Sequence, residues 1–280
     1  RLGGVPERAL PSQALLLCVA EGRDLLGVMA SKSHHATKPE EKYRVVPYSE
    51  LYIDTGLASA ADVEDAGVRI GTAVVYQPRV MALADDRLAG TSVDDRAGCA
   101  VILELAGMLK VMQGLPRVHL VFSVQEEYNL RGVQPAAQAL RPDIAIQIDL
   151  VLATDTPDMA GRGEVSLGGG PAISLYSFHG RGTLNGVIPH PAMARLLEDT
   201  ARAESLSLQR SAHIGALTDL SYVQFTGQGV ASIDVGFPLR YTHSSLEVCD
   251  LADLEGLVLL LAAAVARIDR NFSLDRDDYT

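Results

Sequence analysis

Hydrophobic residues in the first third of the chain fall in short runs that turn residues separate. The runs are rich in Val, Ile, Leu and Tyr, and Gly, Pro and Asp punctuate them, as is typical of β-strands. The predicted strands are Ala14–Val19, Asp24–Met29, Glu50–Asp54, Val68–Tyr76 and Arg79–Leu83. One short helix is predicted at Ser59–Glu64, where a Ser precedes acidic residues as at a capped helix start. Residues 1–88 are therefore predicted to form a small β-rich domain.

After residue 88, longer apolar segments alternate between helical and strand patterns. Arg96–Met112 is apolar on more than one face and is predicted to be a largely buried helix. The other predicted helices are Pro135–Leu140, Pro191–Glu204, Asp219–Phe225 and Leu251–Ile268. The predicted strands are Val118–Val124, Ile144–Ile148, Ala172–Tyr176 and Val230–Val235. Such alternation favours an α/β sheet covered on both faces, so residues 89–280 are predicted to form a second domain.

The charge balance and the cysteine content narrow the classes of function. The 280 residues carry a formal net charge of −11, which argues against nucleic acid or an anionic membrane as the main partner. No apolar run reaches the length of a membrane span, and no signal-peptide pattern is present. Three cysteines without paired spacing suit the reducing cytoplasm, where the protein is predicted to reside. The chain opens at Arg1 without an initiator Met, so we expect an N-terminal segment to precede it.

Acidic residues and one histidine recur beside the ends of the predicted buried segments. Asp94 precedes the first long helix, Glu126 and Glu127 follow one strand, Asp149 follows the next, and His243 follows the last. Ligands gather outside the carboxyl ends of the strands in an open α/β sheet. Carboxylates that converged there would repel one another unless a cation lay between them, and carboxylate with imidazole is a ligand set for zinc or cobalt. The alternative for each acid alone is that it caps a helix or faces water.

The adjacent pair Glu126 and Glu127 suits metal-assisted hydrolysis. At the end of a strand neighbouring side chains can diverge, so one can bind a metal while the other takes a proton from water. The paired carboxylates of a glycosidase must flank the bond that is cleaved, and adjacent residues are poorly placed for that. No Gly-x-Ser-x-Gly motif indicates a serine hydrolase, and Gly161–Gly170 lacks the Lys-Ser/Thr of a phosphate-binding loop.

Five motifs of the chain form a specific set when they are taken together. They are Val93–Cys99, Val124–Glu127, Ile146–Asp149, Leu167–Pro171 and Arg240–Ser244. The set resembles the M42 family of metallo-aminopeptidases, which includes glutamyl and leucyl aminopeptidases and tetrahedral dodecamers, and the resemblance spans essentially the whole chain. It implies a zinc-peptidase-like catalytic domain, an α/β fold with a mixed sheet flanked by helices, at residues 89–280, whose N-terminal part would lie in the expected preceding segment. It also implies that residues 1–88 are a small β-rich, barrel-like insertion domain that helps to build the oligomer.

The resemblance assigns metal-binding roles to the acidic residues and the histidine. Asp94 would bridge two metal ions, and its peptide bond to Asp95 would be cis. Glu127 and His243 would complete one metal site with Asp94, and Asp149 would serve the other site. The expected cofactors are therefore two divalent ions for each subunit, zinc or cobalt.

The resemblance also implies the reaction. Glu126 would be the general base of a metallo-aminopeptidase that removes N-terminal residues from short peptides through metal-activated water. The family's further metal-binding His lies in a His-x-Asp motif upstream of the insertion, and no segment of this chain matches that motif. His34 and His35 align with a stretch inside the insertion, where a loop role is expected. Two alternatives stay open: a catalytically impaired assembly protein of the same fold, or a metallohydrolase of glycans or acylated amino acids. The expected partners are short peptides and further copies of the chain, up to a dodecamer.

Overall fold

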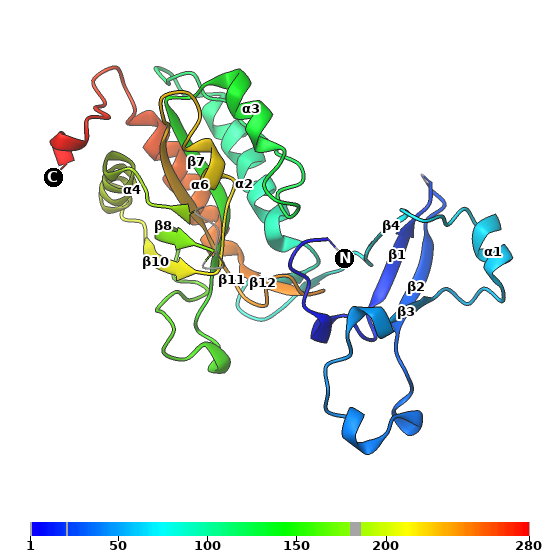
Figure 1. Cartoon of the computed structure of the whole chain (residues 1–280). Helices are drawn as coiled ribbons and strands as arrows, with labels where there is room; N and C mark the ends of the chain where they lie inside the picture. Colours follow the sequence, from blue (N-terminus) through cyan, green and yellow to red (C-terminus); the bar gives the residue numbers. More distant parts are fainter. Residues whose placement is uncertain (1, 21, 180–185, 280) are drawn as a thin grey trace.

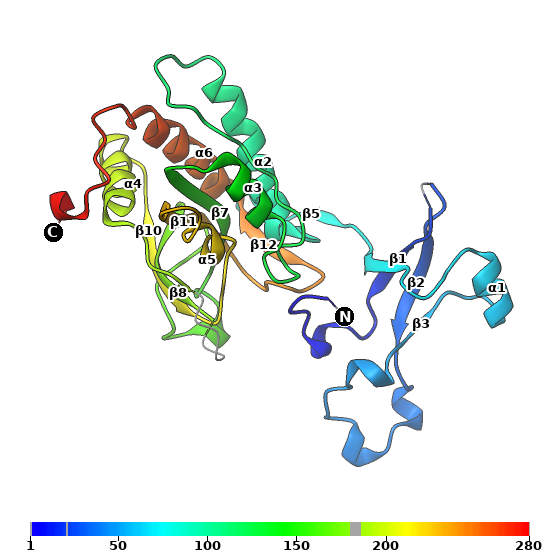
Figure 2. The same cartoon turned by 45° about the horizontal axis from the view of Figure 1, so that its top comes forward.

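The computed structural model of the chain describes residues 2–20, 22–179 and 186–279. Figures 1 and 2 show a body of helices and strands, in green to red, and a smaller β-structured lobe, in blue to cyan, that projects from one side of it. Within the described residues, no helix is both long and apolar enough to cross a membrane. The α-helices are α1 (Ala60–Asp65), α2 (Val93–Leu109), α3 (Val133–Leu140), α4 (Pro191–Ala203), α5 (Leu220–Val223) and α6 (Leu251–Ala266). Short 3-10 helices are η1 (Glu7–Ala9), η2 (His34–Ala36), η3 (Pro39–Glu41), η4 (Tyr48–Glu50), η5 (Pro157–Met159) and η6 (Arg276–Tyr279).

The body is built on a mixed sheet of five strands. Its order is β10 (Gln209–Ile214), β8 (Ala172–Phe178), β11 (Ala231–Leu239) and β7 (Ile144–Leu152), with β9 (Gly186–Val187) paired to β8. β11 runs parallel to β7 and antiparallel to β8, and β10 runs parallel to β8. Every residue of β11 is buried, as expected of a strand that is covered on both faces. The predicted α/β fold with a mixed sheet is confirmed.

Two sets of helices cover the two faces of this sheet, because successive side chains of a strand point to opposite sides. Ile233, Val235 and Phe237 of β11 pack with α2, α4 and α6 in the main hydrophobic core. Ala145 of β7 belongs instead to a smaller cluster, which it forms with residues of α3 and α5. The helices α2, α4 and α6 begin and end within a few residues of their predicted bounds.

The lobe contains a four-stranded sheet, called here the lobe sheet. Its order is β3 (Tyr52–Asp54), β2 (Leu25–Ala30), β1 (Ala14–Cys18) and β4 (Ala73–Tyr76), and all neighbouring strands are antiparallel. Leu15 and Leu17 of β1 are buried on one face. The helix α1 begins after Ser59, whose hydroxyl accepts a hydrogen bond from the backbone N–H of Asp62 at 3.2 Å, as the predicted cap requires.

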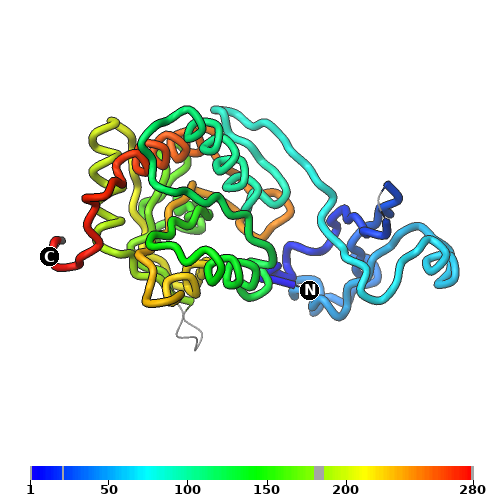
Figure 3. The backbone as a smooth tube through the Cα atoms, turned by 90° about the horizontal axis from the view of Figure 1, so that it is seen from above, coloured from blue at the N-terminus to red at the C-terminus, as the bar shows by residue number. Residues whose placement is uncertain are grey.

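A small three-stranded sheet links the lobe to the body. Its order is β12 (Glu247–Asp250), β6 (Arg87–Gly90) and β5 (Val80–Ala82), and both pairings are antiparallel. The chain passes from β4 through β5 and β6 directly into α2. Figure 3 shows the first residues of the chain, in dark blue, running beside the body before they enter the lobe.

The predicted strand at Val118–Val124 is wrong. In the structure this segment is irregular, and Val118, Phe122 and Val124 are exposed. A strand requires a neighbour that accepts and donates its backbone hydrogen bonds, and no described strand pairs with this segment. The prediction that Glu126 and Glu127 lie at the end of a strand is therefore wrong as well. Both acids lie in the irregular segment that leads into α3.

Candidate metal centre

Three of the predicted metal ligands, Asp94, Glu127 and His243, lie together. The Nε2 atom of His243 is 3.5 Å from Oδ2 of Asp94 and 3.5 Å from Oε1 of Glu127. One donor atom from each residue lies within 4.8 Å of the other two. Two carboxylate oxygens and one imidazole nitrogen are a donor set that zinc and cobalt accept, and the spacing of these atoms is near that around a single ion.

Strand pairing brings these ligands together from distant parts of the sequence. β12 lies antiparallel to β6, with Glu247 opposite Gly90. Asp94 follows the end of β6 by four residues, and His243 precedes the start of β12 by four residues. The two ligands therefore extend from neighbouring strand ends, whereas Glu127 reaches the same place from the irregular segment before α3.

Glu247 is a residue of this site that the sequence motifs do not reveal. It is 2% exposed, and its carboxylate accepts hydrogen bonds from two backbone N–H groups. Oε2 accepts from Asp94 at 2.9 Å, and Oε1 accepts from His243 at 2.7 Å. The one signal in the sequence is an acid directly before the apolar pair Val248 and Cys249, where a solvated side chain is not expected.

Asp149 and Glu126 add to the acidic character of the site. The prediction that Asp149 follows the end of a strand is wrong, because β7 pairs with β11 along its whole length and Asp149 lies inside it. Burial raises the pKa of Asp149 well above its ordinary value, and the charges of Asp95 and Asp94 raise it further. Burial also raises the pKa of Glu126 to about 8, and the adjacent charge of Glu127 contributes.

The residues present fit a divalent cation. The peptide bond between Asp94 and Asp95 is cis, as the family resemblance implies, and Asp95 accepts the N–H of Gly98 at 3.0 Å. Burial and the charge of Asp94 raise the pKa of Asp95 to about 8. The imidazole of His243 faces these groups, and its hydrogen bond to Asp94 is the main reason that its pKa is raised to about 9. An excess of buried carboxylates around one imidazole is the arrangement that a bound metal ion would offset.

The N-terminal segment lies against two of the candidate ligands. A Cβ atom at Gly4 would be 2.7 Å from Nδ1 of His243, and one at Gly3 would be 3.2 Å from Oε2 of Glu127. The carbonyl of Gly4 accepts a hydrogen bond from the His243 ring. A neutral ring that donates one nitrogen to a backbone carbonyl presents its other nitrogen as the ligand atom, and Nε2 is the nitrogen that lies 3.5 Å from Asp94 and Glu127. Neither glycine is revealed by the sequence motifs.

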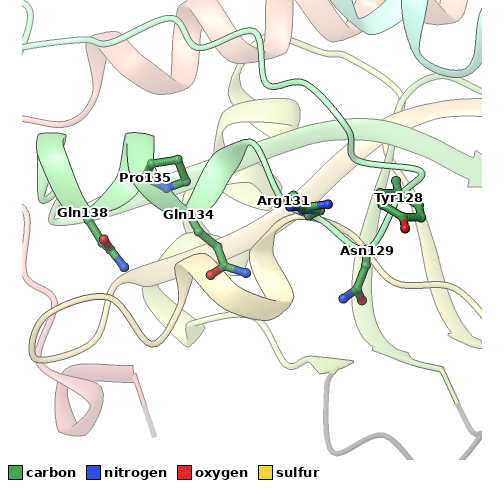
Figure 4. Close-up of a pocket in the computed structure, with 6 residues that line it drawn as sticks. All are labelled: Tyr128, Asn129, Arg131, Gln134, Pro135 and Gln138. Atoms are coloured by element: carbon green, nitrogen blue, oxygen red, sulfur yellow. The ribbon is translucent and has the colours of Figure 1, made fainter.

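Arg131 and Arg240 lie in different surroundings. Arg240 donates to Asp155 through Nε at 2.8 Å and through Nη2 at 2.6 Å, a bidentate salt bridge that fixes the segment after β7. The guanidinium carbon of Arg131 lies 5.5 Å from the centre of the Tyr128 ring. Arg131 and Tyr128, but not Arg240, line a polar hollow formed by residues that follow Glu127 in the chain (Figure 4). Its lining consists of Tyr128, Asn129, Arg131, Gln134, Pro135 and Gln138. His34 and His35, for which a loop role is expected from the sequence, are exposed in η2 of the lobe.

The chain is similar to proteins that are named as aminopeptidases. The model of a family described as M42 glutamyl aminopeptidase matches residues 1–260. A relative from Escherichia coli (strain K12), named as an aminopeptidase, is 34% identical over 280 residues, which cover 100% of this chain and 75% of the relative. The solved structure of an aminopeptidase from the archaeon Desulfurococcus kamchatkensis is 33% identical with a TM-score of 0.87, over 96% of this chain and 72% of that one. A Pyrococcus horikoshii TET peptidase, described as assembling into a tetrahedron or a large octahedral shell, is 26% identical with a TM-score of 0.81, over 95% of this chain and 76% of that one.

Proposed function

The chain belongs to the M42 glutamyl aminopeptidase family, and we propose that it is a metal-dependent aminopeptidase that removes N-terminal residues from short peptides. Family membership makes it a hydrolase that acts on peptide bonds. The observation that carries the finer proposal is the group formed by Asp94, Glu127 and His243, whose donor atoms lie within 4.8 Å of one another. Glu126 precedes one of these ligands directly and is left available for proton transfer.

The proposed metal centre holds two divalent ions, zinc or cobalt. Asp94, Glu127 and His243 would hold one ion, and Asp94 together with Asp149 would hold the second, so that Asp94 is shared. When bound, the ions supply Lewis-acid polarisation of the scissile carbonyl group. The electrostatic support for this assignment is the shared influence of Asp94 on the pKa values of Asp149 and Glu126.

Proton transfer is the proposed role of Glu126. Its carboxylate would accept a proton from the attacking water as the water oxygen bonds to the carbonyl carbon of the substrate. The same carboxyl group would then donate that proton to the amine nitrogen as the carbon–nitrogen bond breaks. Burial of Glu126 limits competing contact with bulk water, which favours transfer between the carboxyl group and the substrate.

The Glu126→Gln variant tests this role. An amide cannot take the proton, so we expect kcat for an N-terminal aminoacyl p-nitroanilide to fall by about 10²–10⁴-fold. Metal content, measured by atomic emission, should stay at the wild-type level because Glu126 is not a ligand. The matched control is Glu104→Gln, an exposed glutamate on α2, for which kcat should be unchanged. Near-normal turnover of the Glu126→Gln variant would contradict the proposal.

We further propose that residues 1–88 form an insertion domain through which copies of the chain assemble, up to a dodecamer, in the cytoplasm. The support for assembly is the Pyrococcus horikoshii peptidase, whose structure is similar to this chain and which is described as assembling into a tetrahedron or a large octahedral shell. The lobe supplies a second reason, because many of its large apolar side chains are exposed. The cytoplasmic location is supported by the three cysteines, all of which are free thiols.

A further inference from the structure

The buried carboxylate of Glu247 connects the backbones of two proposed metal ligands. Its two oxygens accept from different residues: Oε2 from the N–H of Asp94 at 2.9 Å and Oε1 from the N–H of His243 at 2.7 Å. Both acceptor atoms are therefore used on residues whose side chains converge on the candidate metal centre. Glu247 itself does not belong to the group of donor atoms that could hold an ion.

A carboxylate is an unfavourable choice for this position if packing alone is considered. A buried charge is costly unless it is well hydrogen-bonded, and the neighbouring charge of Asp94 adds repulsion. An apolar side chain of similar size would avoid both costs. What the carboxylate provides is a link between the start of α2, which contains Asp94, and the loop that contains His243, two segments far apart in the sequence.

The backbone at His243 gives a reason for such a link. His243 has a φ of +61°, in the left-handed region that residues other than glycine seldom occupy. The hydrogen bond from its N–H to Glu247 fixes the peptide plane in this conformation. On the other side, the ring hydrogen-bonds to the carbonyl of Gly4. Loss of the Glu247 bond would free the backbone to leave the left-handed region, and Nε2 would then move away from Asp94 and Glu127.

We propose that Glu247 is a positioning residue, which sets the separation of Asp94 and His243 and thereby determines the metal affinity of the site. The inference rests on the proposed function, because it requires Asp94 and His243 to bind a metal ion. Residues that orient metal ligands by hydrogen bonds have large effects on affinity without contacting the ion themselves.

Two variants of the full chain test this role with Co²⁺ and Zn²⁺ as probes. In Glu247→Gln the amide nitrogen cannot accept, so one of the two backbone N–H groups loses its partner. Glu247→Asp keeps the charge but withdraws it by one methylene, so it distinguishes position from charge. We expect both variants to bind Zn²⁺ about 10–100-fold more weakly in competition with a chromophoric chelator. The visible absorption band of bound Co²⁺ should also change, because the geometry of its ligands changes.

The matched control is Asp253→Asn. Asp253 of α6 is also buried, at 1% exposed, and also accepts two backbone N–H bonds, from Gly168 at 2.8 Å and Gly170 at 2.7 Å. These partners are not proposed ligands. The variant should therefore have a lower melting temperature than the wild type but the same Zn²⁺ affinity and the same Co²⁺ spectrum.

The possible outcomes separate this inference from the function on which it rests. Wild-type affinity and an unchanged Co²⁺ spectrum in both Glu247 variants would overturn the positioning role and leave the metal centre in place. An equal loss of affinity in Asp253→Asn would overturn it as well, because general destabilisation would then explain the effect. If Glu247→Gln does not fold, the Asp variant decides. A wild-type chain that binds neither ion would refute the proposed function itself.

Discussion

The side chain of Asp234 shows how a single residue of the central strand is tied to the candidate site. Asp234 is 4% exposed on β11, and its Oδ1 accepts a hydrogen bond from the hydroxyl of Thr218 at 2.6 Å. Asp219, which follows Thr218 in the chain, accepts a hydrogen bond from the hydroxyl of Ser123 at 2.6 Å. Ser123 lies three residues before Glu126. Two hydrogen bonds between side chains thus connect the core of the sheet to the irregular segment that carries the proposed general base. The second oxygen of Asp234 is buried without a described partner.

The variant Asp234→Asn should change how stability depends on pH. Burial raises the pKa of Asp234 to about 7, from 3.8. Between these values the folded state binds more protons than the unfolded state, so the free energy of unfolding falls as pH rises through this window. An Asn does not ionise and escapes this loss, which is about 1.4 kcal/mol for each pH unit. From pH 5 to pH 7 we expect the melting temperature of the variant to rise, relative to that of the wild type, by about 3–5 °C for each pH unit. Above pH 7 the difference between the two melting temperatures should stay constant.

The exposed Asp65→Asn variant serves as the control, since its melting curve should follow the wild type at every pH. Melting curves of Asp234→Asn and the wild type that stay parallel from pH 5 to pH 8 would show that the Asp234 carboxyl does not titrate abnormally.

At the scale of elements, the long helices and the buried strands can be predicted from the local hydrophobic pattern. Each has enough residues for the regular spacing of its hydrophobic positions to be recognised. Helix α4, for example, has Pro191 at its first turn and a buried apolar stripe that includes Leu197. The strands β6 and β12 have only four residues each, with charged residues at β12's ends, so their pattern does not predict them. Their pairing is nevertheless what brings Asp94 and His243 together.

The same limit explains the errors around the site. The local hydrophobic pattern of Val118–Val124 favours a strand, but this pattern does not indicate whether a neighbouring strand is present to pair with the segment. The motif residues Asp94, Glu127 and His243 could be named from the sequence. Glu247 could not, because its role depends on two backbone N–H groups that only the folded chain places beside it.

The N-terminal segment can be tested as an element with Gly4→Ala. The added Cβ would lie 2.7 Å from Nδ1 and 3.0 Å from Cε1 of His243, closer than such atoms approach in proteins, so the ring or the segment must shift. Because small displacements of groups in an active site lower the reaction rate strongly, we expect displacement of the His243 ring to lower kcat/KM by about tenfold or more. Steady-state kinetics on an aminoacyl p-nitroanilide measure the change.

The control for this variant is Gly107→Ala in α2, where the new methyl group meets open space. Its kcat/KM should equal that of the wild type. If Gly4→Ala retains full activity, the segment does not constrain the His243 ring.

At the scale of the whole molecule, the outer face of the lobe sheet is the surface best suited to assembly. The register places Leu26 of β2 and Val75 of β4 on either side of Leu16 in β1, so the three side chains point to the same face. Leu26 is 55% exposed and Val75 is 47% exposed, while Val28 extends the same row. A hollow with a largely apolar lining, including Leu26 and Val28, lies on this face. A contiguous apolar face on a stable sheet is typical of a surface that another chain covers.

The double variant Leu26→Asp, Val75→Asp should dissociate the assembly, because burying two carboxylates at an apolar contact is costly. In sedimentation we expect the mass to fall from a multiple of 29.8 kDa towards 29.8 kDa itself. Leu259→Asp is the control, since Leu259 is 48% exposed on α6, away from the lobe, and its charge should leave the mass unchanged. Zn²⁺ affinity should survive in both variants, because Asp94, Glu127 and His243 all come from one chain. An unchanged mass of the double variant would exclude this face as the contact between subunits, and a monomeric wild type would exclude assembly altogether. Neither result would contradict the proposed metal centre, so assembly and catalysis can be judged separately.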